Sequence, residues 1–149
     1  MVEWSEIVAA VGQALGGDRE GGGERMRVAW EATGPDDHAQ RCVLAHYLAD
    51  LEPTLEAEVG WDERALAEFA HVGADELAPV GIPSAAGMAP SLHLNLADGY
   101  RRSGRPADAR RHLEAAEAEA GTLADDGYGE MLRGGIRRLR ERLDAGVTD

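Results

Sequence analysis

The chain has 149 residues and carries 28 acidic against 15 basic side chains, which gives a formal net charge of −13 at pH 7. This excess argues against a nucleic-acid-binding protein and against a protein of anionic membrane surfaces, because both partners require a basic footprint. The single cysteine, Cys42, excludes an intramolecular disulfide, and no apolar run approaches the roughly 20 residues that span a bilayer. The amino-terminal segment has no basic region of the kind that marks a secretory signal, so we expect a cytoplasmic protein.

Apolar spacing predicts two helices in the first 33 residues. One face of the first helix is formed by Trp4, Ile7, Val8, Val11 and Leu15. Gly16 and Gly17 are expected to end this helix. The glycine run 21–23 predicts a flexible joint before a second, short helix that carries Met26 and Trp30.

A second pair of helices is predicted between residues 36 and 70. Gly34 and Pro35 break the chain, and Asp36 or Asp37 is placed to cap a third helix. The apolar stripe of this helix consists of Leu44, Tyr47, Leu48 and Leu51. Pro53 and Thr54 predict a tight turn into a fourth helix, whose stripe consists of Leu55, Ala57, Trp61, Ala65 and Phe69.

The second half of the chain predicts a long loop and three more helices. Residues 79–90 contain three prolines and two glycines, and a loop of this length in a small protein is typical of a functional or mobile connection. A fifth helix is expected at about 91–102, and Pro106 suits the first position of a sixth. The stripe of a seventh consists of Leu132, Ile136, Leu139 and Leu143. No segment alternates as a strand would, so the predicted fold is all-α with about seven helices.

The two central helix pairs correspond to each other at an offset of 52 residues without a gap. The matching pairs are Leu44 with Leu96, Ala45 with Ala97, Leu48 with Tyr100, Ala57 with Ala109, and Trp61 with Leu113. Each unit therefore has large and small side chains at the same places in a helical hairpin. Small residues where two helices cross allow their axes to approach within roughly 8–10 Å.

Residues 93–120 resemble the tetratricopeptide repeat. The signature residues of that family occur at the expected spacings as Leu96, Ala97, Tyr100, Gly104, Ala109, Leu113 and Ala116. The match is degraded in residues 39–69, where Arg64 occupies a position for a small residue and the turn glycine is missing. The resemblance implies a right-handed superhelix of stacked hairpins whose first helices line a concave binding surface, without catalysis. We expect one domain over residues 1–149, with degenerate hairpins at about 3–33, 37–70 and 91–120 and a capping helix at about 124–145.

The resemblance also indicates which side chains face the groove. In the best-matching repeat these are Ser91, Leu94, Asn95, Asp98, Arg101 and Arg102. Asn95 can donate and accept hydrogen bonds, and the two arginines can each form a fork with a carboxylate. We therefore expect a protein or peptide partner. Neither a cofactor nor a metal is implied.

A different chemistry is suggested by four polar residues spaced four apart on the predicted third helix. His38, Cys42, His46 and Asp50 form one stripe, which resembles metal-ligand spacing or a Cys–His nucleophile pair. His38 and His46 lie roughly 12 Å apart along a helix axis, so only adjacent members of the stripe can share an ion. If these residues instead face the groove, Cys42 and His46 are candidate partner contacts.

The charge is distributed unevenly along the chain. Residues 1–100 hold 18 acidic and 5 basic side chains, whereas residues 101–149 hold 10 of each, and every basic residue is an arginine. We expect a partner that is basic where it meets the acidic part and carries a carboxylate where it meets the arginines. The arginines can also pair with carboxylates of the protein itself, or between protomers of a homo-oligomer.

The function that the sequence favours is that of a non-catalytic, tetratricopeptide-like module that binds a protein or peptide. Two alternatives remain open at this point. One is a helical-bundle metal-binding protein or enzyme centred on Cys42 and His46. The other is a homo-oligomerising structural unit.

Overall fold

The computed structural model describes residues 2–146, and this part of the chain contains seven α-helices and no β-strand. The helices are α1 (Trp4–Leu15), α2 (Arg19–Ala32), α3 (His38–Ala49), α4 (Leu55–Phe69), α5 (Ala89–Arg102), α6 (Pro106–Glu119) and α7 (Gly127–Asp144). None of them is long and apolar enough to cross a membrane. The prediction of an all-α fold is confirmed.

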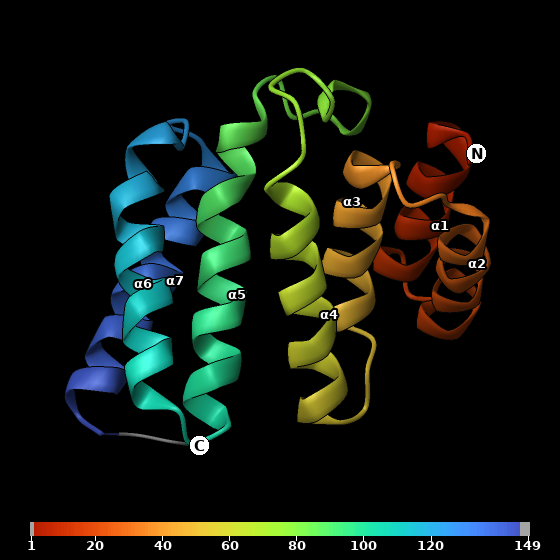
Figure 1. The fold of residues 1–149 in the computed structure, drawn as a ribbon. Coiled ribbons are helices and arrows are strands. Elements are labelled where there is room, and N and C mark those ends of the chain that lie inside the picture. Colours follow the sequence, from red (N-terminus) through yellow and green to blue (C-terminus); the bar gives the residue numbers. More distant parts are fainter. Residues whose placement is uncertain (1, 147–149) are drawn as a thin grey trace. The chain divides into compact units, whose positions relative to one another are not determined.

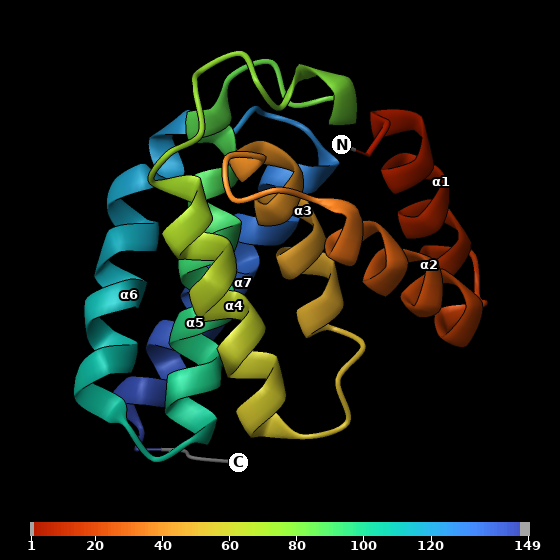
Figure 2. The same ribbon diagram turned by 45° about the vertical axis from the view of Figure 1, so that its right-hand side comes forward.

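The chain divides into two compact units after Pro83. The first unit contains α1 to α4, which form two hairpins, α1 with α2 and α3 with α4 (Figures 1 and 2). The second contains the hairpin of α5 and α6 together with α7 (Figure 1). A single tetratricopeptide-like domain over the whole chain, and a right-handed stacking of its hairpins, stay predictions.

The first unit is held together by α3, which packs against α4, α2 and α1. Its core combines a few large side chains with many alanines. The fully buried members include Ile7, Ala10, Met26, Cys42, Leu44, Ala45, Leu48, Ala49, Ala65 and Leu77. Because the alanines are small, the helix backbones approach each other closely.

The glycine run 21–23 is part of α2, so the predicted flexible joint is wrong. Asp18 caps the helix, its Oδ1 accepting a hydrogen bond of 2.9 Å from the Gly21 amide. Gly22 faces α1, where a Cβ would lie 2.5 Å from the Ala14 nitrogen and 2.8 Å from the Ala10 carbonyl oxygen. The glycine is needed for close packing between two helices, a requirement that its local propensity does not reveal.

The second hairpin begins and ends near the predicted residues, with one difference in its caps. Asp37 precedes α3, but its Oδ2 accepts from the Gly34 amide at 2.8 Å and not from the first turn of the helix. Thr54 is a conventional cap, because its Oγ1 accepts from the Ala57 amide at 3.2 Å. The aspartate therefore fixes the turn before α3.

The predicted loop 79–90 contains two 3₁₀ turns, Ala78–Val80 and Ala85–Met88, and α5 begins at Ala89, two residues earlier than expected. Pro90 is tolerated there because backbone N–H groups in the first turn of a helix have no acceptor within the helix. A proline, which has no N–H group, therefore costs no hydrogen bond at this position. Leu77, fully buried, anchors the start of this segment in the first unit.

In the second unit α7 packs against both α5 and α6 (Figure 1). The predicted stripe of α7 is buried, with Leu132, Ile136, Leu139 and Leu143 between 4 and 6% exposed. The 52-residue offset holds for the helices themselves, because α3 shifted by that amount falls within α5. Gly104, between α5 and α6, has a φ of 74°, a conformation that favours glycine.

We expect Gly22→Ala to lower the free energy of unfolding by about 1–3 kcal/mol, because the added methyl meets the backbone of α1. Gly12→Ala is the matched control, since a Cβ there meets nothing within 4 Å, and it should stabilise the protein by about 0.5–1 kcal/mol. Chemical denaturation of both variants measures the difference. Equal effects would show that the α1–α2 contact does not require glycine.

Candidate functional site

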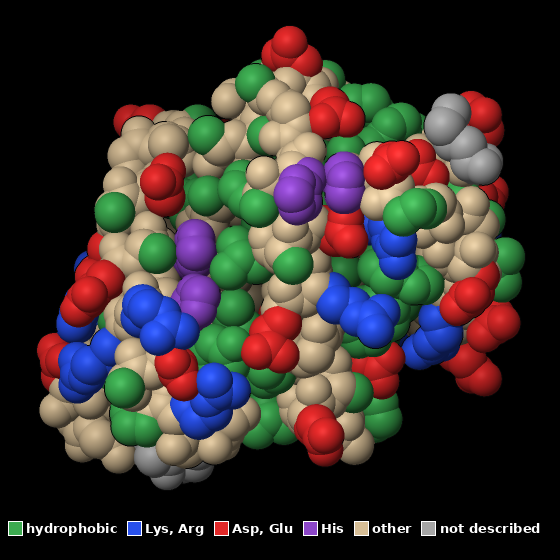
Figure 3. Space-filling model, viewed as in Figure 1, with side chains coloured by type: hydrophobic (Ala, Val, Ile, Leu, Met, Phe, Trp, Pro, Cys, Tyr) green, Lys and Arg blue, Asp and Glu red, His purple; other side chains and the backbone are tan. Residues whose placement is uncertain are grey.

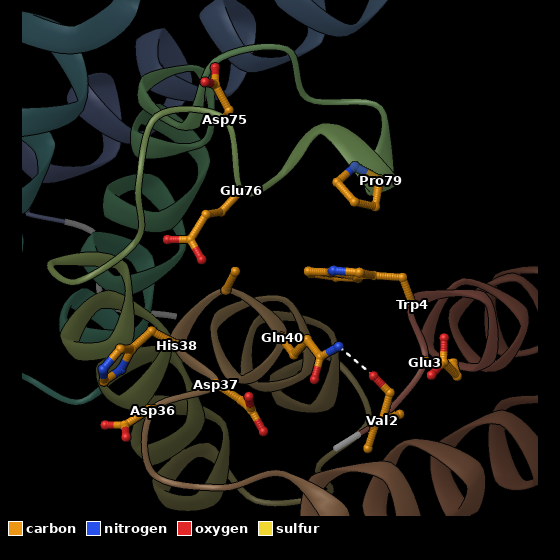
Figure 4. A pocket seen from close by; sticks show the side chains of 11 residues that line it. Val2, Glu3, Trp4, Asp36, Asp37, His38, Gln40, Asp75, Glu76 and Pro79 are labelled. Carbon is orange, nitrogen blue, oxygen red and sulfur yellow. Dashed lines mark hydrogen bonds between the residues drawn. The ribbon is translucent and has the colours of Figure 1, made fainter.

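Two cavities of the first unit lie against α1, α3 and the segment 75–80. The first, the acidic cavity, has a volume of about 390 Å³ (Figure 4). Its described lining consists of Val2, Glu3, Trp4, Asp36, Asp37, His38, Ala39, Gln40, Asp75, Glu76 and Pro79. The second, the apolar cavity, has a volume of about 280 Å³ and is lined by Ile7, Val8, Val11, Gly12, Leu15, Val43, Tyr47, Pro79 and Val80. Because Pro79 lines both, the two cavities are neighbours.

The acidic cavity combines carboxylates, an indole ring and a buried amide. Figure 4 shows the Trp4 ring between Pro79 and Gln40, with Glu76 and Asp37 on the other sides of the hollow. Gln40 is 7% exposed, and its Nε2 donates to the Val2 carbonyl oxygen at 2.5 Å. Its buried Oε1 has no hydrogen-bond partner within residues 2–146. An acceptor of this kind is costly to leave unpaired.

The local backbone holds the acidic side chains in place. Asp37 is fixed by its hydrogen bond from the Gly34 amide, and Glu76 Oε1 accepts from the Gly73 amide at 2.5 Å. Each of these carboxylates keeps its second oxygen for other contacts. The bond from Gln40 to Val2 joins the start of α1 to α3. Three separate segments of the chain therefore meet at this cavity.

The apolar cavity continues along the same two helices. Val8 and Leu15 of α1 are 45% and 72% exposed, although both are large and hydrophobic. They lie beside Val43 and Tyr47 of α3 in the cavity lining. Contiguous exposed apolar surface of this kind marks an interaction site more often than isolated exposed residues do.

Cys42 and His46 lie on α3 but do not line either cavity. Cys42 has no exposed surface, so it differs from the expected groove-facing residue. Burial, together with the Glu68 carboxylate, raises the pKa of its thiol to about 12. His46 is half-buried with its Nδ1 inside the protein, and burial lowers its pKa to about 4. Neither environment favours the thiolate–imidazolium pair of a cysteine nucleophile.

The other candidates lie on α5, in the second unit. Asp98 binds both arginines, with 2.9 Å to Arg101 Nη2 and 2.9 Å to Arg102 Nε. Arg101 is buried, whereas Asn95 is half-buried. The two guanidinium groups thus already hold a carboxylate of their own helix. To bind a partner's carboxylate, as expected from the sequence, they would have to share or release Asp98.

Many arginines of the second unit form ion pairs within that unit. Arg105 and Arg111 both bind Asp108, and Arg140 binds Glu117. On the face seen in Figure 3, arginines and carboxylates lie interleaved over α5 and α6. Pairing with the protein's own carboxylates was one of the open predictions, and these contacts confirm it. In the first unit the acidic side chains far outnumber the arginines, so most of its carboxylates cannot be paired in this way.

Four of the five histidines form two pairs, and Figure 3 shows histidines in purple. The rings of His38 and His71 lie tilted against each other with 4.7 Å between their centroids, and His38 Nδ1 lies 2.7 Å from Glu68 Oε2. His93 and His112 face each other with 3.1 Å between their Nδ1 atoms, and burial lowers the pKa of His93. Within the described residues no three His, Cys, Asp or Glu side chains converge as for a metal ion.

Sequence reasoning missed the residues of both cavities. Trp4 and Ile7 were assigned to the core stripe of the first helix, and Gln40 carried no signal. One indication was available, because the long loop was expected to be functional or mobile, and Pro79 and Val80 at its start line the cavities. Convergence of the segments 2–4, 36–40 and 75–79 is a tertiary property.

We expect the Cys42 thiol to be inert in the folded protein. At pH 8 a rise in pKa from 9.0 to about 12 lowers the thiolate fraction by about a thousandfold. An aromatic disulfide reagent should therefore label the protein only after denaturation. Rapid stoichiometric labelling of the native protein would show that Cys42 is accessible and ionised.

We expect His46 to make the protein less stable in mild acid. Its pKa is lowered on folding, so the unfolded chain takes up the proton first, and stability falls as the pH drops from about 6.5 towards about 4. With allowance for partial exposure, the loss due to this group is about 2 kcal/mol at about pH 4.5. Urea unfolding of the parent and of His46→Gln near pH 7 and about pH 4.5 measures it. The same acid loss in both proteins would contradict the prediction.

No protein-family model, curated protein or solved structure matches the chain in three comparisons with known proteins. The resemblance of residues 93–120 to the tetratricopeptide repeat therefore stays a prediction made from those residues. The function has to be inferred from the site itself.

Proposed function

We propose that the protein is a non-catalytic binding module that recognises a peptide segment of another protein. The segment would lie along α1 and α3, with its side chains in the acidic and apolar cavities. The observation that carries this proposal is the position of the cavities, which are both lined by the first helices of the two hairpins of the first unit. These are the helices to which the tetratricopeptide resemblance assigns the binding surface.

The composition of the lining supports this proposal. Binding sites for peptides combine apolar surface, which provides affinity, with a few polar groups that fix orientation. The apolar cavity offers aliphatic side chains of α1 and α3, and the acidic cavity offers hydrogen-bond acceptors beside an indole. An enzyme centred on Cys42 and His46 has less support, because its thiol is buried and its imidazole resists protonation.

A library of random peptides displayed on phage and selected on the immobilised full-length protein tests the proposal. We expect selection to enrich related sequences whose binding falls by about tenfold or more in Val8→Asp and in Trp4→Ala. Both side chains line a cavity, Val8 being 45% exposed and Trp4 half-buried. The matched control is Val28→Asp, which places the same charge at an exposed valine of α2.

Two outcomes would overturn the proposed function. The first is that no sequence family is enriched on the folded protein. The second is that the enriched peptides bind the parent, Val8→Asp and Trp4→Ala equally well, which would place them outside the cavities. Circular dichroism and thermal unfolding of each variant separate loss of binding from loss of fold.

A further inference from the structure

We propose that the acidic cavity binds the guanidinium group of an arginine side chain in the partner segment, while an apolar side chain of the same segment enters the apolar cavity. This inference rests on the proposed function and names the chemistry of the partner.

The first argument is charge. Five acidic side chains line the cavity, Glu3, Asp36, Asp37, Asp75 and Glu76, and no arginine occurs among its described lining residues. The chain has no lysine. A hollow lined by acceptors of one sign attracts a cation and strengthens its binding when water is displaced.

None of the five arginines of the first unit lines the cavity, and three of them contact other groups. Arg25 binds Glu6 at 2.9 Å, and Arg19 donates to the Asp50 carbonyl oxygen at 2.7 Å. The guanidinium carbon of Arg41 lies 4.4 Å from the centre of the Trp30 ring. The arginine contacts described for the first unit therefore leave out the five carboxylates of the cavity.

The second argument is the buried amide of Gln40. Its Nε2 is used by the Val2 carbonyl oxygen, and its Oε1 is without a partner among the described residues. Gln40 is more than nine-tenths buried and lines the cavity. A residue of the cavity lining thus carries an unsatisfied acceptor, and a ligand that brings N–H groups close to it would reduce the cost of leaving it unpaired.

The third argument selects guanidinium over ammonium. The indole of Trp4 lines the cavity together with carboxylates from two other segments (Figure 4). A guanidinium is planar, stacks on an aromatic face and presents five donors in that plane to surrounding acceptors. An ammonium group is a compact, strongly hydrated charge that uses the flat indole less well.

The neighbouring apolar cavity sets a second requirement. Helix α1 contributes Trp4 to the lining of the acidic cavity and Val11 to the lining of the apolar cavity. Seven residues of helix rise about 10 Å. A peptide in the polyproline II conformation rises about 9 Å over three residues, which complete one turn, so side chains three residues apart point to the same face. An arginine followed or preceded at that spacing by a leucine-like side chain would occupy both cavities.

The test uses the full chain and the capped peptide acetyl-Ala-Arg-Ala-Ala-Leu-amide. Its twin carries citrulline in place of arginine, which keeps the shape and loses the charge. Titrations followed by two-dimensional ¹⁵N NMR report on the Trp4 indole N–H and the Gln40 amide. We expect both signals to shift with the arginine peptide, and the citrulline twin to bind about tenfold more weakly or worse.

Protein variants provide the second arm. Asp37→Asn, Asp75→Asn and Glu76→Gln combined remove three charges but keep the acceptors for the Gly34 and Gly73 amides. This variant should lose about tenfold in affinity for the arginine peptide. The matched control combines Glu20→Gln, Glu24→Gln and Glu31→Gln on α2, which removes the same charge from exposed positions away from the cavity. It should change the affinity by less than about twofold.

Four results would overturn the inference. Equal binding of the citrulline twin, or an equal loss in the control variant, would mean that the cavity does not select a guanidinium. Saturable Ca²⁺ binding that shifts the Gln40 amide and excludes the peptide would assign the cavity to a divalent cation. A dimer in sedimentation that the cavity variant returns to a monomer would assign it to a second copy of the chain.

The proposed function is tested separately. If the selected peptides carry no arginine but still require Trp4, the protein binds peptides and only the arginine assignment fails. If selection enriches nothing, both fail.

Discussion

Close contact between helix backbones is the constraint on which the rest of this structure depends. The packed helices carry alanine or glycine at many of their buried positions, which include Ala10, Gly22, Ala45, Ala65, Ala97 and Ala109. At Gly22 the approach is so close that a single methyl group would collide with the backbone of α1. A core of small side chains leaves little tolerance for added volume, since packing of this density transmits even small changes.

The same packing produces the candidate site. Because α3 contacts α1 as well as α2 and α4, the starts of α1 and α3 are close enough for Gln40 to donate to the carbonyl oxygen of Val2. Leu77 is fully buried, and this brings the following turn against α1 and allows Pro79 to line both cavities. The cavities are thus a consequence of how hairpins and their connections pack, and their lining comes from segments whose sequences show no common motif.

The two units use charge in different ways. In the second unit the numbers of carboxylates and arginines nearly balance, and many of them form ion pairs with one another, as Asp108 does with Arg105 and Arg111. Exposed pairs of this kind contribute little to stability, but they do reduce the charge that is offered to a partner. In the first unit the acidic side chains outnumber the arginines, and several gather at the acidic cavity. This contrast is the reason for which the proposed basic partner is assigned to this cavity.

The sequence by itself determined that the fold is all-α and where most of its helices lie, with the start of α2 as the main exception. Apolar periodicity, the turn at Pro53 and Thr54, and Pro106 at a helix start were sufficient for this, because each depends on residues a few positions apart. Only the tertiary structure decided the role of Gly22, the burial of Cys42, the pairing of Arg140 with Glu117 and the cavity around Gln40. The backbone preferences of glycine are the same in a flexible joint and at a close contact between helices. A carboxylate is equally polar whether or not an arginine is paired with it. Which of these holds depends on neighbours that are distant in the chain, and only the packed structure brings those neighbours together.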